Sequence, residues 1–278
     1  MSDLLTPASI QALLTAHGLK PSRALGQNFL ADPNTARKIV RLAGVTVGDH
    51  VVEVGPGLGS LTLALVEAGA LVTAVELDQY LRPVLETLTA GTPVTVIAGD
   101  ALTIDWFEVL GDDPCTMVAN LPYNIATPML MRAIEIAPMI KKYLVMVQRE
   151  VGERLAAGPG SRTYGAVSVR LAYWATARVV GSVPPTVFVP RPNVDSALVE
   201  VTRLSKPSVD IADRQRMFTL IASGFATRRK SLRQSLRPVL GDRTDAVLAG
   251  ANIDGLTRAE ALGIEMWAEL ARSDARIA

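Results

Sequence analysis

The chain has 278 residues, of which 49% are hydrophobic and 20% are charged, with 28 basic against 27 acidic side chains. This composition is typical of a globular protein and excludes a disordered chain. A single cysteine, Cys115, excludes an intramolecular disulfide framework, and two histidines without a paired-cysteine motif argue against a zinc site. The N-terminus lacks the basic region of a secretory signal, and the longest uncharged stretch, 114–131, is interrupted by Asn120, Pro122, Asn124 and Pro128. We therefore expect a cytoplasmic protein without a membrane segment or a bound metal.

The first part of the chain predicts two helices joined by a loop. Thr6-Pro7 and Asp32-Pro33 each place an N-cap residue before a proline at the first helical position. These pairs predict helices over 7–17 and 33–43. The segment 20–30 between them has no clear hydrophobic period, and we expect it to form an ordered loop.

From residue 50, short apolar runs alternate with helical stretches. The pattern predicts helices at 60–68, 79–89 and 127–137, and strands at 51–54, 71–77, 93–98, 115–120 and 142–148. Two later β-rich runs, near 177–183 and 195–203, bring the strands to seven. Strands separated by helices indicate βαβ units. We therefore predict an α/β fold with a doubly wound, mostly parallel, seven-stranded Rossmann-like sheet.

The pattern becomes helical after residue 204. Thr257-Arg258-Ala259-Glu260 has the form of a capping box, which predicts a helix carrying Leu262, Met266, Trp267 and Leu270. We expect two domains, an α/β domain over residues 1–204 and a small helical domain over 205–278. Since no heptad repeat is present, we expect a monomer.

Three features at the ends of consecutive predicted strands indicate a nucleoside cofactor. The first strand runs into a glycine loop, Gly55-Pro56-Gly57-Leu58-Gly59, where backbone can approach a ligand at a helix N-terminus. Glu76 ends the second strand, where a carboxylate accepts hydrogen bonds from ribose hydroxyls. Asp100 follows the third strand and could accept from an adenine amine. Alone, the glycines would fit a tight turn equally well, but the two carboxylates favour a cofactor. The GxGxG spacing favours S-adenosylmethionine over a dinucleotide.

The segment Asn120-Leu121-Pro122-Tyr123 follows the fourth strand and predicts methylation of an exocyclic amine on a base. Such an amine is a poor nucleophile because its lone pair is delocalised into the ring. An amide oxygen from Asn120 and the carbonyl of Leu121 can accept its two N–H bonds, while Pro122 makes the turn rigid. The Tyr123 ring can stack on the base. The alternative is a strand-end turn beside a half-buried core aromatic.

At these residues the chain resembles the ribosomal RNA adenine dimethyltransferase family, in its bacterial small-subunit branch. The resemblance spans nearly the whole chain and is carried by LGQNFL (25–30), EVGPGLGSLT (53–62), VELD (75–78), GDAL (99–102), NLPYNIATP (120–128), MVQREVGERL (146–155), YGAVSV (164–169) and FVPRPNVDSAL (188–198). It implies a class I methyltransferase that transfers four methyl groups from S-adenosylmethionine to the N6 amines of two adjacent adenosines. These adenosines lie in the 3′-terminal hairpin of 16S rRNA in the small (30S) ribosomal subunit or its precursor.

The resemblance also implies site residues. The family's cofactor contacts correspond to Asn28, Leu30, Gly55, Glu76, Asp100 and Asn120, with Gln27 beside them and Gly57 in the same glycine loop. Phe188 resembles the family's second aromatic, opposite Tyr123 across the target base, although core packing explains it equally well. Ala126 departs from the pattern, because many relatives have a small hydroxyl residue there.

A basic region lies in the predicted helical domain. Seven basic residues and no acidic one occur between 214 and 238. Five of them are expected on one helix, with 229, 233 and 237 on one face: Arg228, Arg229, Lys230, Arg233 and Arg237. The region could track an RNA backbone. A solvated helix face is the alternative.

Two other functions remain open from the sequence. One is a large-subunit rRNA adenine methyltransferase of the macrolide-resistance type, and the other is a non-catalytic RNA-binding assembly or transcription factor that keeps the fold. The runs NLPYNIATP and FVPRPNVDSAL and the long C-terminal region favour the small-subunit enzyme. The intact Glu76 and Asn120–Tyr123 argue against lost catalysis.

Overall fold

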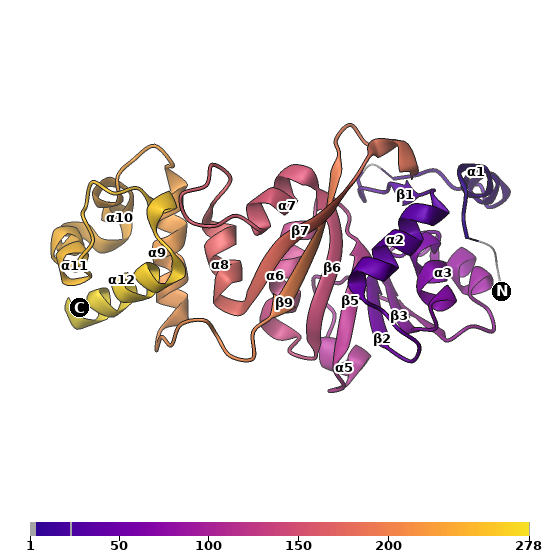
Figure 1. Ribbon diagram of the computed structural model, residues 1–278, viewed down its shortest axis with the longest axis horizontal. Coiled ribbons are helices and arrows are strands. Elements are labelled where there is room, and N and C mark those ends of the chain that lie inside the picture. Colours follow the sequence, from indigo (N-terminus) through magenta and orange to yellow (C-terminus); the bar gives the residue numbers. More distant parts are fainter. Residues whose placement is uncertain (1–3, 23, 278) are drawn as a thin grey trace. The chain divides into compact units, whose positions relative to one another are not determined.

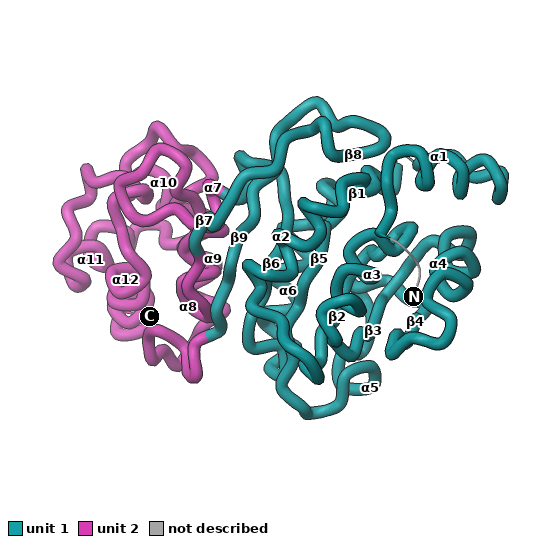
Figure 2. Tube along the Cα trace, turned by 45° about the vertical axis from the view of Figure 1, so that its right-hand side comes forward, with its two compact units in different colours: residues 1–152, 178–203 teal, residues 153–177, 204–278 magenta. Residues whose placement is uncertain are grey.

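The computed structural model describes residues 4–22 and 24–277 (Figure 1). The chain forms two compact units: residues 1–152 with 178–203, and residues 153–177 with 204–278 (Figure 2). The sequence places a single boundary after residue 204. In the structure, the segment 153–177 also belongs to the helical unit, because Tyr164, Val169 and Tyr173 are buried in the same hydrophobic cluster as the C-terminal helices.

A seven-stranded sheet forms the centre of the first unit, as the sequence predicts. Its order is β4-β3-β2-β5-β6-β9-β7. The strands are β2 (His50–Val54), β3 (Leu71–Glu76), β4 (Val94–Ala98), β5 (Cys115–Asn120), β6 (Ile140–Gln148), β7 (Ala175–Val183) and β9 (Ser196–Arg203). The first five in this order pair in parallel, and β9 pairs antiparallel with β6. Cys115 is buried at the start of β5.

Helices precede, connect and follow the strands of this sheet. Those up to the start of the second unit are α1 (Pro7–Ala16), α2 (Pro33–Ala43), α3 (Ser60–Glu67), α4 (Arg82–Leu88), α5 (Trp106–Leu110), α6 (Ala126–Ile136) and α7 (Arg149–Leu155). The predicted caps are confirmed: Thr6 accepts from the Ser9 backbone N–H at 3.2 Å, and Asp32 accepts from that of Thr35 at 2.9 Å. Ile39 of α2 and Leu65 of α3 are buried in one cluster with strand residues, so these two helices cover the same face.

The segment 20–30 is not wholly a loop, which corrects the sequence prediction. Its end forms β1 (Phe29–Leu30), which pairs antiparallel with β8 (Phe188–Val189) in a separate two-stranded sheet. The 3₁₀ turn Pro185–Val187 leads into β8, and the Val187 carbonyl accepts from the Ala31 N–H at 2.7 Å. A two-residue strand has no period of its own, so only its distant partner identifies it.

The second unit is helical. It contains α8 (Ala166–Trp174), α9 (Arg214–Ala226), α10 (Leu232–Leu240), α11 (Thr244–Gly250) and α12 (Ile264–Ile277). Trp267 is fully buried in its core, and Gly224 packs so closely that a Cβ there would lie 2.4 Å from the indole ring. The predicted capping box at 257–260 is wrong as a helix start. Leu262 has extended backbone, so Ala259–Ala261 form only a 3₁₀ turn before α12.

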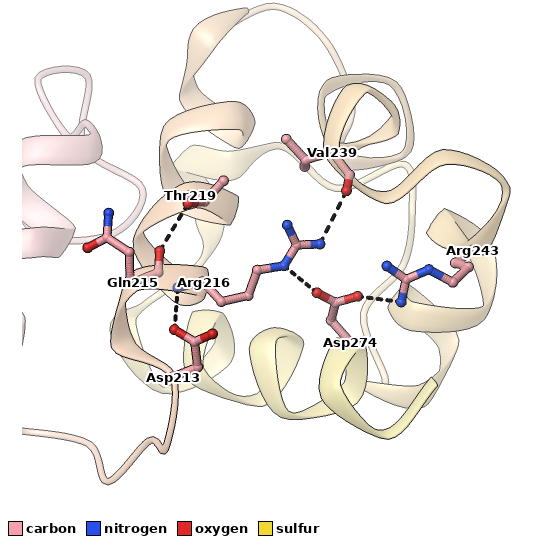
Figure 3. A network of polar contacts seen from close by, with 7 residues as sticks. All are labelled: Asp213, Gln215, Arg216, Thr219, Val239, Arg243 and Asp274. Carbon is pink, nitrogen blue, oxygen red and sulfur yellow. Dashed lines mark hydrogen bonds and ion pairs between the residues drawn. The ribbon is translucent and has the colours of Figure 1, made fainter. Parts of the chain in front are cut away.

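Polar contacts connect the helices of this unit. Asp274 of α12 is buried and accepts from Arg216 Nε at 2.6 Å and from Arg243 Nη1 at 2.7 Å, while Arg216 also donates to the Val239 carbonyl (Figure 3). One carboxylate thus joins α9, α12 and the turn Gly241–Arg243. Within the described part of the chain, no helix has both the length and the apolar character needed to cross a bilayer.

Candidate functional site

A cavity opens at the carboxyl ends of the parallel strands in the first unit. Its free space is about 1020 Å³ including open solvent. It lies where the strand order reverses between β2 and β5, the position at which doubly wound sheets bind ligands. Its lining includes 25–30, 53–58, Ser60, Leu61, 75–77, Leu81, 99–101 and 120–125. Every predicted cofactor residue therefore lies on one cavity.

The glycine loop and Glu76 form one wall. Gly55 and Gly57 have positive φ, and Cβ atoms there would meet the Pro122 ring at 3.4 Å and the Phe29 ring at 3.0 Å. Glu76 is 6% exposed and accepts from the backbone N–H of Gly57 at 2.9 Å and of Asp78 at 2.8 Å. Burial raises the pKa of Glu76 while these N–H groups oppose the shift. A carboxylate has about four acceptor positions, so Glu76 keeps acceptor capacity for a ligand hydroxyl.

Two residues of the same wall have no assigned role in the sequence analysis. Glu53 is 1% exposed and accepts from Thr62 Oγ1 at 2.6 Å, and burial raises its pKa to about 8. Ser60 begins α3, and its buried hydroxyl has no hydrogen-bond partner among the described residues. A buried polar atom without a partner is costly. Ser60 lines the cavity at the N-terminus of α3, a position that favours a polar ligand group. In the sequence, Glu53 and Ser60 are marked only by their positions on either side of the glycine loop.

The segment 24–30, here called the N-terminal segment, lies along the cavity and is held by hydrogen bonds on two sides. Gln27 Nε2 donates to Asp78 Oδ2 at 2.7 Å, and Gln27 Oε1 accepts from the Ser22 backbone N–H at 2.7 Å. On the other side, Asn124 Nδ2 donates to the Ala24 carbonyl at 3.1 Å. The Gln27 side chain therefore positions this segment and the loop after Glu76, in addition to lining the cavity.

Asn120 to Tyr123 form the opposite wall. Asn120 ends β5, and its Nδ2 donates to the Asn28 carbonyl at 3.1 Å, which leaves Oδ1 free of that contact. Leu121 is anchored because its N–H donates to the Met146 carbonyl at 3.1 Å. Tyr123 is partly buried, and burial raises its pKa. The wall thus places the Asn120 amide, a backbone turn and the Tyr123 ring on this cavity.

The structure does not place Phe188 on this cavity. Its side chain is 3% exposed and belongs to the hydrophobic cluster that contains Leu30, its partner across the β1–β8 ladder. The core-packing alternative is therefore the one seen in this structure. A stacking role for Phe188 stays a prediction, since it would need the side chain to leave the cluster.

The basic residues of the second unit do not share one helix, which corrects the prediction. Arg228, Arg229 and Lys230 lie between α9 and α10, because α9 ends at Ala226 and the backbone is extended at Ser231, and only Arg233 and Arg237 lie on α10. Arg228 pairs with Glu260 at 3.4 Å, and Arg233 pairs with Asp245 at 2.6 Å.

The remaining cations of this region are exposed. The side chains of Arg229, Lys230 and Arg237 have no polar partner among the described residues. Two arginines that sequence reasoning missed, Arg162 and Arg258, lie nearby. The Arg162 carbonyl accepts from Arg228 Nη2 at 2.7 Å. Arg258 follows Thr257, whose carbonyl accepts from the N–H of Leu232. Both are exposed, and they are separated from the 228–230 loop in sequence, which is why no local pattern joined them.

The chain is similar to the proteins of one known family over most of its length. The family described as ribosomal RNA adenine dimethylase matches residues 18–275. The chain belongs to this family. A relative from Cutibacterium acnes named ribosomal RNA small subunit methyltransferase A is 46% identical over 95% of this chain and 92% of its own length. A protein of the same name from Streptomyces coelicolor is 45% identical over 96% of each chain.

Solved structures share the fold. The crystal structure of the 23S rRNA methyltransferase ErmE has a TM-score of 0.67 and 25% identity, covering 89% of this chain and all of that one. A dimethyladenosine transferase from Plasmodium falciparum has a TM-score of 0.73 at 23% identity, covering 87% of this chain and 95% of that one. As a member of this family, the chain is an rRNA adenine dimethyltransferase with a Rossmann-like catalytic unit and a helical C-terminal region.

Proposed function

We propose that the protein transfers four methyl groups from S-adenosylmethionine to the N6 amines of two adjacent adenosines in the 3′-terminal hairpin of 16S rRNA, within the small ribosomal subunit or its precursor. The observation that carries the proposal is the wall Asn120–Tyr123 on the same cavity as Glu76 and the glycine loop. The 46% and 45% identity to proteins named for the small subunit supports that substrate over the large subunit. We expect the protein to act as a monomer in the cytoplasm.

The residues present fit S-adenosylmethionine. Glu76 would accept from the ribose hydroxyls and Asp100 from the adenine amine. Gly55 and Gly57 allow a close backbone approach, and the partnerless Ser60 hydroxyl would meet a polar group of the amino-acid end. Asn28, Leu30 and Gln27 would close the cavity from the N-terminal segment. When bound, this molecule supplies an electrophilic methyl group.

The protein's own residues would raise the reactivity of the target amine. Asn120 Oδ1 and the Leu121 carbonyl each accept one N–H of that amine, which favours a pyramidal nitrogen with its lone pair directed at the methyl group. Tyr123 stacks on the extruded base. The amine is neutral when it attacks, so no general base is needed first. The cation formed loses its proton to water.

The exposed cations of the second unit would contact RNA phosphates. Arg229, Lys230 and Arg237 have side chains that no acidic residue neutralises among the described residues. Arg228 and Arg233 would contribute less, because each already forms an ion pair. Such contacts add affinity without reading sequence.

The test is methyl transfer from radiolabelled S-adenosylmethionine to small subunits isolated without this modification. The wild-type protein is compared with Asn120→Ala and with the control Asn34→Ala, which makes the same change on an exposed residue of α2. We expect dimethyladenosine at two adjacent sites of the 16S hairpin, a loss of about 10²–10³-fold in kcat for N120A, and full activity for N34A.

Two results would contradict the proposal. Label on large-subunit RNA, with none on the small subunit, would assign the protein to the other branch. Tight binding to small subunits without any transfer would indicate a non-catalytic assembly factor.

A further inference from the structure

The hydroxyl of Tyr123 has a specific partner on a distant strand. It shares a hydrogen bond of 2.7 Å with Ser196 Oγ, and Ser196 is 0% exposed. The terminal torsion of a tyrosine is broad when nothing holds the ring, because it joins sp³ and sp² carbons. A hydrogen bond at the far end of the ring therefore narrows the range of planes that the ring can adopt.

The backbone that carries Ser196 is itself fixed. Ser196 is the first residue of β9 and lies opposite Gln148, the last residue of β6. The residue after Gln148 and the residue before Ser196 are also bonded to each other: the Arg149 backbone N–H donates to the Asp195 carbonyl at 2.9 Å, and Arg149 Nη1 lies 3.0 Å from Asp195 Oδ2. These contacts hold the backbone at Ser196 in place.

The sheet topology brings the two residues to one edge. β9 runs antiparallel to β6, so it begins at the edge where β5 and β6 end. In the order β5-β6-β9, β6 lies between β5, which ends three residues before Tyr123, and β9, which begins at Ser196. The hydrogen bond to Ser196 means that the ring is held at its Cβ by the turn after β5 and at its hydroxyl by β9.

We propose that Ser196 is a positioning residue for methyl transfer, which acts by fixing the plane of the Tyr123 ring against the target base. This inference rests on the proposed function of Asn120 to Tyr123. Ser196 does not line the cavity, so it acts through Tyr123. It determines how well the base is aligned and leaves cofactor binding unchanged.

The test is a double-mutant cycle with Ser196→Ala and Tyr123→Phe. Each variant removes one partner of the hydrogen bond, and Y123F keeps the aromatic face. We expect each to lower kcat on unmodified small subunits by about 10- to 100-fold, the size of effect that a small misplacement causes. The double variant should be no slower than the slower single one, because the same bond is lost. The Kd for S-adenosylmethionine should change less than about twofold.

The control is Thr73→Val. Thr73 is also a buried strand hydroxyl with a side-chain partner, since its Oγ1 lies 3.0 Å from His50 Nε2, and it does not line the cavity. Losing this hydroxyl should leave kcat unchanged, which separates ring positioning from the general loss of a buried hydrogen bond. Thermal unfolding of every variant shows which ones are folded.

Each possible result either supports or overturns the positioning role of Ser196. Wild-type kcat in folded S196A or Y123F would overturn the inference while leaving the proposed function intact, as would additive losses in the double variant. If S196A does not fold, Y123F decides alone, because its ring and backbone remain: a wild-type kcat overturns the inference, and a 10- to 100-fold loss supports it. An inactive wild type would overturn the proposed function and this inference together.

Discussion

The side-chain amide of Asn120 donates to the backbone carbonyl of Asn28 across 3.1 Å, although the two residues are 92 positions apart. A carbonyl oxygen can only accept, so the amide nitrogen must face Asn28, and this fixes the direction of the amide oxygen. The N-terminal segment thereby orients the group that would accept from the target amine. One hydrogen bond therefore joins the segment 24–30 to the residue that the proposed function assigns to amine positioning.

Replacing Glu76 by Gln should weaken cofactor binding strongly. The carboxylate accepts from two backbone N–H groups and would accept from the ligand, whereas an amide nitrogen in place of one oxygen would face the N–H of Gly57 or Asp78. Hydrogen bonds to charged groups contribute about 1.5–3 kcal/mol, so we expect the Kd for S-adenosylmethionine to rise about 10- to 150-fold. Calorimetry measures this directly. Unchanged affinity would exclude Glu76 as a cofactor contact, and binding to small subunits serves as the control.

Gly57→Ala should lower the free energy of unfolding by more than the strain of a positive φ alone explains. Gly57 has φ +59°, and its Cβ would lie 3.0 Å from two atoms of the Phe29 ring. Gly91 has φ +73° with nothing within 4 Å, so G91A is a matched control that has only the backbone cost, about 1–2 kcal/mol. We expect chemical denaturation to show a larger loss for G57A, with weaker cofactor binding. If G57A and G91A lost the same free energy of unfolding, the Phe29 ring would have to move aside without an energetic cost.

Local sequence predicts a feature of this fold when the residues that determine the feature lie within one helix or strand. The prolines after Thr6 and Asp32, and the apolar runs of the sheet, act within a few residues, and the predicted elements are confirmed. Pairings across the chain have no such signal: β1 exists only because Phe188 and Val189 lie opposite it.

The incorrect predictions have the same cause. A capping box at 257–260 is locally plausible, but Glu260 pairs with Arg228 and the helix begins at Ile264. The site residues could be placed on strand ends because parallel strands end at one edge. Ser196 could not be connected with Tyr123 in this way, since the direction of β9 had to be known first.

The stability of the empty protein should fall as pH rises, with Glu53 as the main cause. Burial raises the Glu53 pKa from its ordinary value of 4.5 to about 8. Between these values the folded protein holds a proton that the unfolded chain has released, so the stabilisation present below pH 4.5 is lost as pH rises through 8. The slope reaches up to about 1.4 kcal/mol per pH unit. Glu53→Gln has no proton to lose. Denaturation at about pH 6 and about pH 9 should show a smaller decline in E53Q, and parallel curves would refute this assignment.

Asp274→Asn should destabilise the helical unit. The carboxylate side chain is 5% exposed and holds Arg216 and Arg243, which are 31% and 38% exposed (Figure 3). Removing one partner of a fully buried pair costs about 3–5 kcal/mol, and solvent screening of these arginines reduces our expectation to about 1–3 kcal/mol. Urea denaturation provides the measurement. Glu269→Gln, in an exposed group with Arg272 and Arg276, should cause no measurable loss. A D274N variant as stable as wild type would show that the arginines are satisfied by water.

The salt dependence of small-subunit binding should identify which cations contact phosphates. Each phosphate contact adds about 0.7–0.9 to the slope of log K against log salt concentration, because a counterion is released. Arg229→Ala and Lys230→Ala should each lower the slope by about this amount, since neither side chain has a polar partner among the described residues. Arg272→Ala is the control: its guanidinium is held by Glu269 and the Asp210 carbonyl. Binding curves at four salt concentrations give the slopes. A drop for R272A equal to that for R229A would mean that net charge alone sets affinity, and that the 228–230 loop is a solvated surface.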